Sequence, residues 1–308
     1  MFNDCKKVLP NSFKKVWRCN TCLIELINMI LIKGVKKLSN GFVISINSSK
    51  GGVGKSSTVR SLAYSLNDRG FKVGILDFCQ NSSVALHFTN NREQFKGSTV
   101  REWIVENKHI SEVIQQVEGT NIYFIPSDDR VEEIPYQLEE MGMDREELKW
   151  ALDRKIEPLR SIFDFILIDT HPSENDKNAL MSVVAAKNNG MVIIPTLLEK
   201  ESITATKRMA KICRDEKIQY IVLPLKVKTG FFGKHVKYIK ELEKEFKIEG
   251  LHSFSEHFIR ESSVIPDMSL SGASFEDMKA NKYAARVLDD YNKLLDVILT
   301  YTKEGETV

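Results

Sequence analysis

The segment spanning residues 47–57 constrains the fold more than any other part of this 308-residue chain. Its sequence, NSSKGGVGKSS, follows the apolar run 42–46 and precedes a helical pattern over residues 59–66. A strand, a glycine-rich loop and a helix start in this order form the context of a phosphate-binding loop. Glycines let successive backbone N–H groups point inward, and the helix N-terminus adds partial positive charge. The segment therefore predicts a phosphate site at the end of a strand.

Side chains of this loop add the groups that a nucleoside triphosphate with Mg²⁺ requires. Lys55 is placed to contact the β- and γ-phosphates, and the Ser56 hydroxyl is placed to bind Mg²⁺. The general pattern GxxxxGK[ST] needs a glycine where Ser49 stands, whereas this loop carries a second lysine, Lys50, before a pair of glycines. The loop is therefore complete at its helix end and unusual at its start.

Residues 50–56, KGGVGKS, resemble the deviant Walker A loop, KGGxGK[ST], of the ParA/MinD family of dimeric ATPases. The resemblance implies that Lys50 enters the nucleotide site of a partner subunit, so that Lys50 and Lys55 both serve catalysis. It also implies that ATP and Mg²⁺ are the cofactors. The loop residues expected to bind the nucleotide are Lys50, Gly51, Gly52, Val53, Gly54, Lys55, Ser56 and Ser57.

From residue 42 onward, short apolar runs alternate with helical patterns. The expected strands are 42–46, 71–77, 121–126, 163–169, 191–195 and 219–224. The expected helices lie near 56–68, 176–187, 201–214 and 234–247, within 130–161, and in a long C-terminal stretch through Tyr283, Val287, Tyr291, Leu294 and Ile298 that packs on the sheet. This order predicts an α/β fold with a doubly wound, mainly parallel sheet and helices on both faces. We expect one P-loop ATPase domain over residues 41–308.

Two aspartates stand at predicted strand ends, where ligands bind in such folds. Asp169 ends a strand in the sequence IDTHPS, which resembles the Walker B segment of the family, with His171 where a proline is common. A strand-end aspartate can also act only as a turn or helix cap. Asp77 lies 22 positions after Lys55, the spacing of the first aspartate in the family's switch segment DxDPQ. The resemblance implies that Ser56, Asp77 and Asp169 hold the metal and that Asp77 takes part in catalysis.

The second aspartate of that switch segment, which positions the attacking water in the family, falls on Cys79. Alternatively, one residue is deleted and the register shifts. In either alignment one carboxylate of the usual pair is missing. Because a neutral thiol orients water poorly, we expect firm ATP binding with slow hydrolysis.

Residues 1–40 form a basic extension with a net charge of +6, whereas the whole chain carries +2. Apolar residues between Leu23 and Val35 have helical spacing. Three interpretations stay open: a helix that packs on the body or a partner, a basic arm for DNA or another anionic surface, or a mistaken translation start upstream of Met29. The apolar stretch is too short to span a bilayer. Cys19 and Cys22 form a lone CxxC without the second pair of ligands that structural zinc needs.

The C-terminal half distinguishes relatives within the family. Residues 258–265, FIRESSVI, resemble the IPRxxx[VL] segment of partition ATPases, which bind DNA without sequence preference. By that resemblance, the expected DNA contacts are Lys226, Lys228, Lys234, Lys237 and Arg260. Glutamates at 241, 243 and 245 keep a merely solvated charged face as the alternative.

Two further kinds of relative, the membrane-binding ATPases and the bacterial tyrosine kinases, fit the C-terminal sequence less well. The acidic residues Asp289, Asp290 and Asp296 suit a membrane-binding helix poorly, so no membrane partner is expected. Only Tyr291 and Tyr301 stand where bacterial tyrosine kinases with a related loop carry a tyrosine cluster. By resemblance, backbone groups after the strand that ends at Pro195 surround the adenine.

Two functions follow as expectations. The leading one is a slow, partner-stimulated ATPase that forms an ATP-sandwich homodimer, binds non-specific DNA and segregates plasmid or chromosomal DNA with a centromere-binding adaptor protein. It would be cytoplasmic and associated with the nucleoid. The alternative is an ATP-gated DNA-binding regulator of replication or copy number that hydrolyses little ATP.

Overall fold

The structure is a computed structural model that describes residues 38, 40–89, 91, 93–172, 177–228, 230, 232–251, 255, 257–264 and 275–304. The basic extension expected over residues 1–40, with its three cysteines, lies outside the described residues apart from Leu38 and Asn40. The division between that extension and the ATPase domain therefore stays a prediction.

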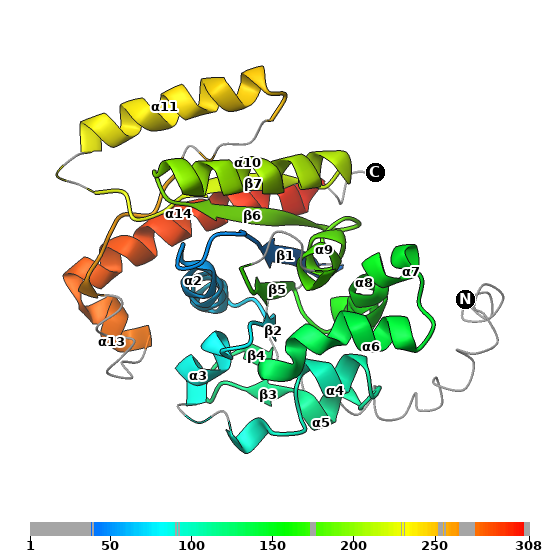
Figure 1. Ribbon diagram of the computed structural model, residues 1–308. Coiled ribbons are helices and arrows are strands. Elements are labelled where there is room, and N and C mark those ends of the chain that lie inside the picture. Colours follow the sequence, from blue (N-terminus) through cyan, green and yellow to red (C-terminus); the bar gives the residue numbers. More distant parts are fainter. Residues whose placement is uncertain are drawn as a thin grey trace.

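Within the described residues, one seven-stranded sheet has the order β3-β4-β2-β5-β1-β6-β7 (Figure 1). The strands are β1 (Phe42–Ile46), β2 (Val73–Phe78), β3 (Gln115–Gln116), β4 (Ile122–Ile125), β5 (Phe165–Thr170), β6 (Gly190–Thr196) and β7 (Tyr220–Pro224). All neighbouring pairs are parallel except β3 with β4. The six predicted strands are confirmed, and the edge strand β3 was missed because two residues are too short to show a pattern.

Helices connect the strands and cover both faces of the sheet. The first group comprises α2 (Lys55–Asp68), α3 (Ser83–Thr89), α4 (Val100–Ile104), α5 (Ile110–Val113), α6 (Ile134–Glu140), α7 (Arg145–Lys149) and α8 (Ala151–Ile156). The second comprises α9 (Lys177–Val184), α10 (Lys200–Asp215), α11 (Phe232–Ile248), α13 (Phe275–Ala280) and α14 (Lys282–Glu304). Short 3₁₀ turns lie at Glu93–Phe95, Asp129–Glu133 and Glu157–Ser161. Capping boxes at Thr99 and Asp144 begin α4 and α7.

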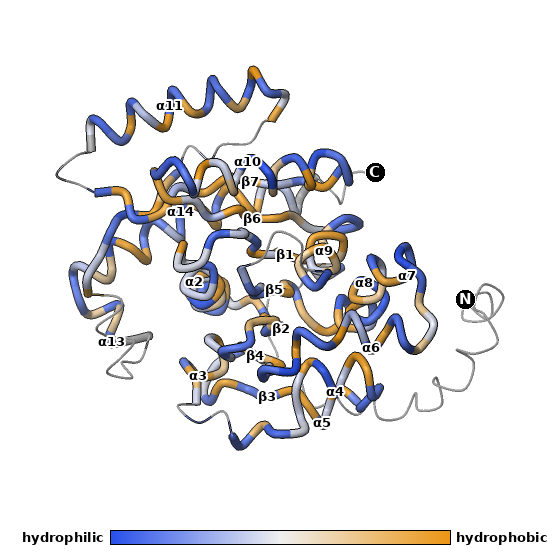
Figure 2. Tube along the Cα trace, in the orientation of Figure 1, coloured by the Kyte–Doolittle hydropathy of each residue, from blue (hydrophilic) through white to orange (hydrophobic). Residues whose placement is uncertain are grey.

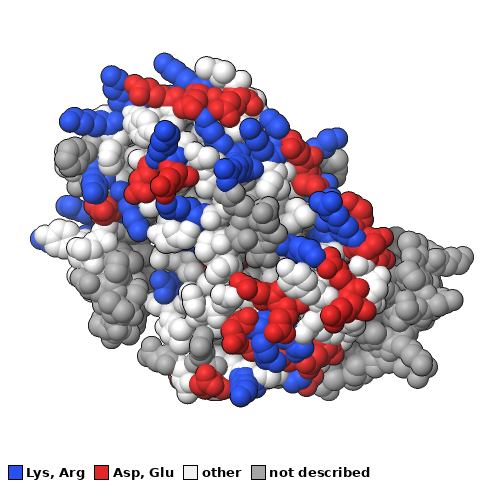
Figure 3. Space-filling model, in the orientation of Figure 1, with Lys and Arg blue, Asp and Glu red and all other residues white. Residues whose placement is uncertain are grey.

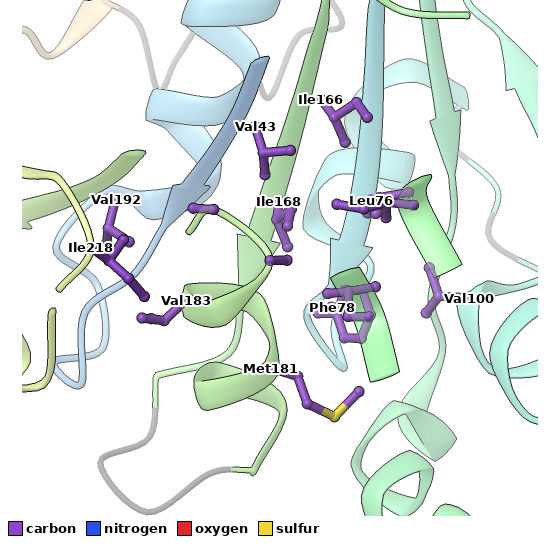
Figure 4. Packing of buried hydrophobic residues seen from close by; sticks show 14 of the residues in the cluster. Val43, Leu76, Phe78, Val100, Ile166, Ile168, Met181, Val183, Val192 and Ile218 are labelled. Atoms are coloured by element: carbon purple, nitrogen blue, oxygen red, sulfur yellow. The ribbon is translucent and has the colours of Figure 1, made fainter. Parts of the chain in front are cut away.

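Alternate residues of the central strands point to opposite faces of the sheet and pack in two separate cores. Because helices cover both faces, the doubly wound fold is confirmed. In β1, Phe42, Ile44 and Ile46 pack with residues of α2, α3 and α14. Val43 faces the other core, with α4, α6, α8, α9 and α10. Figure 1 shows these two groups of helices on opposite sides of the sheet, and Figure 4 shows Val43, Ile166 and Ile168 of the strands and Met181 and Val183 of α9 among the residues of this core. The central strands are predominantly apolar in Figure 2 because they are buried on both faces.

The long C-terminal helix α14 forms as expected and packs in the core on one face of the sheet, which confirms the prediction except at its first turn. Val287, Tyr291 and Ile298 are buried in the core that contains α2, and the Tyr291 hydroxyl lies 3.3 Å from Thr58 Oγ1 on α2. Tyr283, expected on the same apolar face, is 51% exposed. The prediction was wrong at Tyr283 because that first turn of α14 extends beyond the core beside α13.

The buried side chain of Arg160 binds the residues that precede strands β1 and β6. Arg160 donates to the backbone oxygens of Gly41 (3.1 Å), Ala185 (3.1 Å) and Asn189 (3.2 Å) and to Asp153 (2.9 Å). Its charge is paired with Asp153, and both terminal nitrogens of the guanidinium group donate hydrogen bonds, which offsets the cost of burying this ion pair. β1 and β6 therefore start from a common anchor.

Candidate nucleotide-binding site

The predicted phosphate loop leaves the sheet at its centre. Ile46, the last residue of β1, lies opposite Asp169 of β5 on one side and Ile193 of β6 on the other. Residues 47–54 then turn over these strand ends, and α2 begins at Lys55. The expected strand, loop and helix are thus confirmed, and the loop lies at the carboxyl edge of the sheet.

The backbone of the loop suits an anion. Gly54, which precedes α2, has a φ of 105°, and a β-carbon there would lie 2.9 Å from Leu225 Cδ1. A larger residue would therefore meet both strain and a clash. Within the described part of the chain, the N–H groups of residues 51–54 donate no hydrogen bond. Unpaired donors next to a helix N-terminus are what a phosphate requires.

Lys55 lies beneath the loop rather than in solvent. It is only 6% exposed, and its ammonium group donates to the backbone oxygens of Ser48 (3.1 Å) and Lys50 (3.2 Å). Burial lowers the pKa of Lys55 to about 8, although the Asp169 carboxylate counteracts this effect. A phosphate would supply a better partner for this charge than two carbonyl groups.

Asp169 has the properties of a group that awaits a cation. It is fully buried, and neither carboxylate oxygen has a hydrogen-bond partner among the described residues. Burial raises its pKa, while the Ser56 hydroxyl and the positive charges of Lys55 and Arg60 act in the opposite direction. Ser56 and Asp169 are thus brought together, and these oxygen ligands fit Mg²⁺.

The second predicted metal ligand, Asp77, has a different environment. It lies beside Asp169 in register on the neighbouring strand β2 and is also fully buried. One of its oxygens accepts from Cys79 N (3.0 Å), and the other accepts from Val84 N (3.2 Å) and Ala85 N (3.4 Å). Asp77 therefore caps the start of α3, whereas Asp169 keeps its lone pairs open.

No group of three or more His, Cys, Asp and Glu side chains that could hold a metal forms within the described ranges. This fits Mg²⁺, which usually binds proteins through one or two carboxylates and takes its other ligands from water and substrate phosphates. The burial of two adjacent carboxylates raises the pKa of Asp77 as well, with Asp169 as the second cause. A divalent cation would relieve this repulsion.

Sequence reasoning missed Arg60 as a member of the site. It lies one helical turn after Ser56 on α2, so both side chains are on one face. Its guanidinium group lies 3.4 Å from Ser57 Oγ and interacts electrostatically with Asp169 and Asp77. The i, i+4 spacing from Ser56 was the available signal.

Cys79 lies in the same neighbourhood. Its side chain is buried, its sulfur is 3.8 Å from Ser83 Oγ, and its backbone oxygen accepts from the Ser127 hydroxyl (2.5 Å). Burial raises the pKa of the thiol, and the two aspartates raise it further. The thiol is therefore protonated at neutral pH and cannot act as an anionic base.

Lys50 lies on the other side of the loop, toward α10. Its ammonium group is 2.5 Å from Glu201 Oε2, in the first turn of that helix. The Lys50 side chain is 31% exposed and that of Glu201 is 82% exposed. Because exposed ion pairs contribute little to stability, this contact can be exchanged for another partner at small cost.

The five predicted DNA contacts do not form one patch of free charges. Lys226, which has a φ of 54°, donates to Gly52 O of the phosphate loop (3.2 Å). Arg260 binds Asp290 of α14 through two nitrogens (2.7 and 2.8 Å). Lys228, Lys234 and Lys237 are exposed at the start of α11 or just before it. The structure thus separates three surface lysines from two residues with contacts inside the molecule.

α11 itself has one buried face and one basic face. Leu242 and Phe246 are buried against the core. By the helical repeat of about 100° per residue, the opposite side of the helix holds Lys237, Lys240, Lys244 and Lys247, and Lys234 lies on its flank. Lys237 lies 3.9 Å from Glu241 in a weak ion pair. Figure 3 shows both signs of charge over this end of the molecule, so the helix is amphipathic without being uniformly basic.

Pro195, predicted beside the adenine, lies within β6 rather than at its end. It is buried and opposite Leu223 of β7, and the strand continues to Thr196. Leu197 follows, with its N–H bound to Ser202 Oγ (2.9 Å). The strand therefore ends one residue later than predicted, and the place of the adenine beside it stays a prediction.

Comparison with known proteins identifies the family. A family model described as an AAA domain, AAA_31, matches residues 41–220, which is more than half of the chain. The chain belongs to the AAA_31 family. This match covers the phosphate loop and both aspartates, which the fold brings together.

A curated relative of this AAA_31 protein is the tyrosine-protein kinase CpsD of Streptococcus agalactiae. It is 28% identical over 152 residues, which cover 49% of this chain and 61% of the kinase. The chain thus spans between about half and three fifths of the length of the curated relatives that it matches.

Solved structures show the same fold. A McdA variant from Cyanothece in complex with ATP has a TM-score of 0.68 and 20% identity, covering 84% of this chain and 97% of McdA. A plasmid partition protein of Borrelia burgdorferi has a TM-score of 0.61 and 21% identity, covering 84% and 98%. Cobyrinic acid a,c-diamide synthase of Mycobacterium smegmatis, with an ATP analogue and magnesium, has a TM-score of 0.67 and 16% identity, covering 86% and 96%. The ParA/MinD-type fold predicted from the loop is confirmed.

None of the described helices combines the length and apolar character needed to cross a membrane.

Proposed function

We propose that this AAA_31 protein binds ATP with Mg²⁺ and hydrolyses it slowly as an ATP-gated dimer of the ParA type. The observation that carries the proposal is the phosphate loop, in which Lys55 is buried beneath N–H groups without partners while Asp169 faces it with open oxygens. Solved relatives of this fold hold ATP, or an ATP analogue with magnesium. ATP is accordingly the ligand to test first.

Each residue of the site has a distinct role in this proposal. The loop N–H groups and Lys55 hold the phosphates, while Ser56 and Asp169 hold Mg²⁺ and its waters. When bound, Mg²⁺ withdraws charge from the phosphate oxygens and so stabilises the transition state. Asp77 holds the start of α3 and thus positions the segment that contains Cys79. Lys50 serves the partner subunit's nucleotide after leaving Glu201.

The protonated thiol of Cys79 supports slow hydrolysis. The resemblance places it where a carboxylate positions water, yet it is buried beside two carboxylates that keep it protonated. The attacking water would then have no carboxylate to orient it or to accept its proton, which lowers the rate of hydrolysis. An adaptor protein that supplies the missing group or closes the site would stimulate turnover.

The biological role that we propose is partition of plasmid or chromosomal DNA with a centromere-binding adaptor, at the nucleoid. Its support is the Lys50 loop, the basic face of α11 and the similarity to a plasmid partition protein. For DNA contact we propose Lys228, Lys234 and Lys237 as the principal residues, with Lys226 and Arg260 released from their contacts only if the molecule rearranges.

A second candidate is an ATP-gated DNA-binding regulator that hydrolyses little ATP. The observation that favours it is again the buried thiol at the expected position of the second switch carboxylate. Tyrosine kinase activity, suggested by the curated relatives, finds less support. Tyr291 is buried, with its hydroxyl beside Thr58, and so is not an accessible phosphate acceptor.

One assay separates these functions. Purified protein is incubated with ATP and Mg²⁺, alone, with DNA, and with DNA plus the product of the adjacent gene, and both free phosphate and phosphotyrosine are measured. Phosphate release stimulated by the adjacent gene product supports the partition ATPase. Stable DNA binding with ATP and unstimulated turnover supports the regulator, and phosphotyrosine without phosphate release would contradict both.

A further inference from the structure

The residue two positions after β7 has a backbone conformation that it does not favour. Lys226 has a φ of 54°, which lies in the left-handed region. This region is uncommon for residues with a β-carbon, and Asn and Asp adopt it more readily than Lys. The described residues show it at Ser82, Asn107 and Lys217 as well. Such strain persists only where the surrounding structure imposes it, and it is concentrated at functional sites.

The other left-handed lysine, Lys217, has a local cause. It follows Glu216, the C-cap residue of α10, and its N–H donates to Arg214 O (3.0 Å). A left-handed residue directly after a helix is a common way to end it. Lys226 instead lies between the end of β7 and the start of α11. The two lysines therefore share a conformation but not its cause.

Backbone hydrogen bonds fix the residues on both sides of Lys226. The N–H of Leu225 donates to Thr196 O at the end of β6 (2.8 Å). The N–H of Val227 donates to Ile259 O (3.0 Å). With both neighbours held in this way, Lys226 cannot change its φ without disturbing one of these bonds. The fold thus imposes the strained conformation.

The same segment contacts the phosphate loop at two points. Leu225 is buried, and a β-carbon at Gly54 would lie 2.9 Å from its Cδ1. The ammonium group of Lys226 donates to Gly52 O (3.2 Å). The C=O and N–H of a trans peptide point in opposite directions. The Val53 N–H, which shares the peptide with Gly52 O, therefore points away from Lys226, and it is one of the loop donors without a partner among the described residues.

We propose that Lys226 is a positioning residue of the nucleotide site, which holds the Gly52 carbonyl so that the Val53 N–H is presented to a phosphate group. The inference rests on the proposed ATP-binding function. It assigns to the phosphate loop a lysine that the sequence pattern assigns to DNA. Lys226 is exposed, so its bond competes with water and adds little to stability. Its effect is to fix one peptide before the ligand arrives, which lowers the cost of ordering the loop on binding.

The test uses variants that separate the contact from the backbone strain. Lys226→Gly removes the contact and relieves the left-handed conformation. Lys217→Gly is the matched control, because it removes an exposed lysine with a nearly identical φ (57°) beyond the end of α10. Lys226→Asn also removes the contact, but asparagine keeps a β-carbon and tolerates the left-handed region. It keeps the test valid if glycine loosens the segment. Lys226→Arg retains a charged donor.

Urea unfolding measures stability, and titration with ATPγS and Mg²⁺ measures affinity. We expect Lys226→Gly and Lys217→Gly to be at least as stable as the unsubstituted protein, because both relieve strain. Lys226→Gly and Lys226→Asn should weaken ATPγS binding about fivefold, which corresponds to about 1 kcal/mol. Lys217→Gly should leave the affinity unchanged, and Lys226→Arg should retain most of it.

A residue with a merely structural role would lower stability and affinity together, whereas here affinity falls and stability does not. The loss should also be the same at low and high salt, because it arises from the orientation of a peptide and not from a screened charge. Equal ATPγS affinity in Lys226→Gly and the unsubstituted protein would overturn the inference. So would an equal loss in Lys217→Gly, or a loss that disappears at high salt.

Inorganic tripolyphosphate is the second probe, because it requires the phosphate donors and not the base. We expect Lys226→Gly to weaken its binding by the same factor as that of ATPγS. A protein that binds tripolyphosphate with this loss but does not bind ATPγS would support the role of Lys226 and overturn the proposed ATPase function. Firm ATPγS binding that Lys226→Gly does not weaken would overturn only the role of Lys226, and a protein that binds neither probe would overturn both.

Discussion

Replacing Asp169 by asparagine should stabilise the protein without ligand while weakening its response to Mg²⁺. The carboxylate is fully buried, without hydrogen-bond partners among the described residues, and adjacent to Asp77. An unpaired buried group costs about 1–3 kcal/mol when it is neutral and more when it is charged, so asparagine, which stays unpaired, removes only the part due to the charge. Lys55 and Arg60 offset part of this cost. We therefore expect the free energy of unfolding to rise by about 1 kcal/mol in Asp169→Asn.

The same substitution one strand away should have the opposite effect. Asp77 accepts three backbone N–H groups, and an asparagine would turn its amide nitrogen toward some of these donors. Because an amide nitrogen cannot accept a hydrogen bond, the N–H groups that face it lose their partner. This costs about 1–3 kcal/mol and is partly offset by removal of the buried charge. Asp77→Asn should therefore lower the free energy of unfolding by about 1 kcal/mol.

Urea unfolding of the three proteins measures both effects, with no ligand, with ATPγS alone and with ATPγS plus Mg²⁺. For Asp169→Asn, a tenfold loss of Mg²⁺-dependent affinity would remove about 1.4 kcal/mol of the stabilisation by saturating ligand. Asp77→Asn should keep most of it. An Asp169→Asn variant that is less stable without ligand and yet fully stabilised by Mg²⁺ and ATPγS would refute this reasoning.

Four further predictions concern single groups. Lys50→Ala should abolish ATP-dependent dimerisation, measured by light scattering, while ATP still binds; a variant that dimerises with ATP would refute the role of Lys50 in the partner's site. Lys234→Glu with Lys237→Glu should weaken DNA binding and reduce the slope of log affinity against log salt by about 2, without affecting ATP binding; unchanged affinity would place the DNA site elsewhere. Cys79→Asp should raise the single-turnover hydrolysis rate about tenfold or more, and an unchanged rate would show that Cys79 does not occupy the water-positioning place. Burial, with Arg60 as the second cause, lowers the pKa of His87 to about 4, so the folded state resists protonation and stability falls as the pH drops from about 6.5 to 4. His87→Gln should remove about 3 kcal/mol of that fall, and an identical pH profile would count against it.

The local parts of the site could be predicted because each rests on neighbours in the sequence. The strand, glycine loop and helix between residues 42 and 68 follow from hydrophobic pattern and glycine placement. The parallel sheet follows from buried strands that alternate with helices. β3 left no such signal, since a two-residue strand has no periodicity.

Only the tertiary structure decided what the charged side chains do. Asp77 and Asp169 look alike in sequence, but the chain after β2 turns so that the N–H groups of Cys79, Val84 and Ala85 reach Asp77. Neither carboxylate oxygen of Asp169 has a hydrogen-bond partner among the described residues. Likewise Arg260, predicted to contact DNA, has its charge paired with Asp290, which lies thirty residues later. Partners so distant along the chain are brought together by packing, and no local pattern records them.

The sequence by itself therefore determined the phosphate loop and the sheet that presents it. The tertiary structure decided which carboxylate is open to a cation and which lysines remain on the surface. The physical reason is the range of the interactions: backbone conformation and hydrophobic period act over a few residues, whereas burial and charge pairing depend on the whole fold.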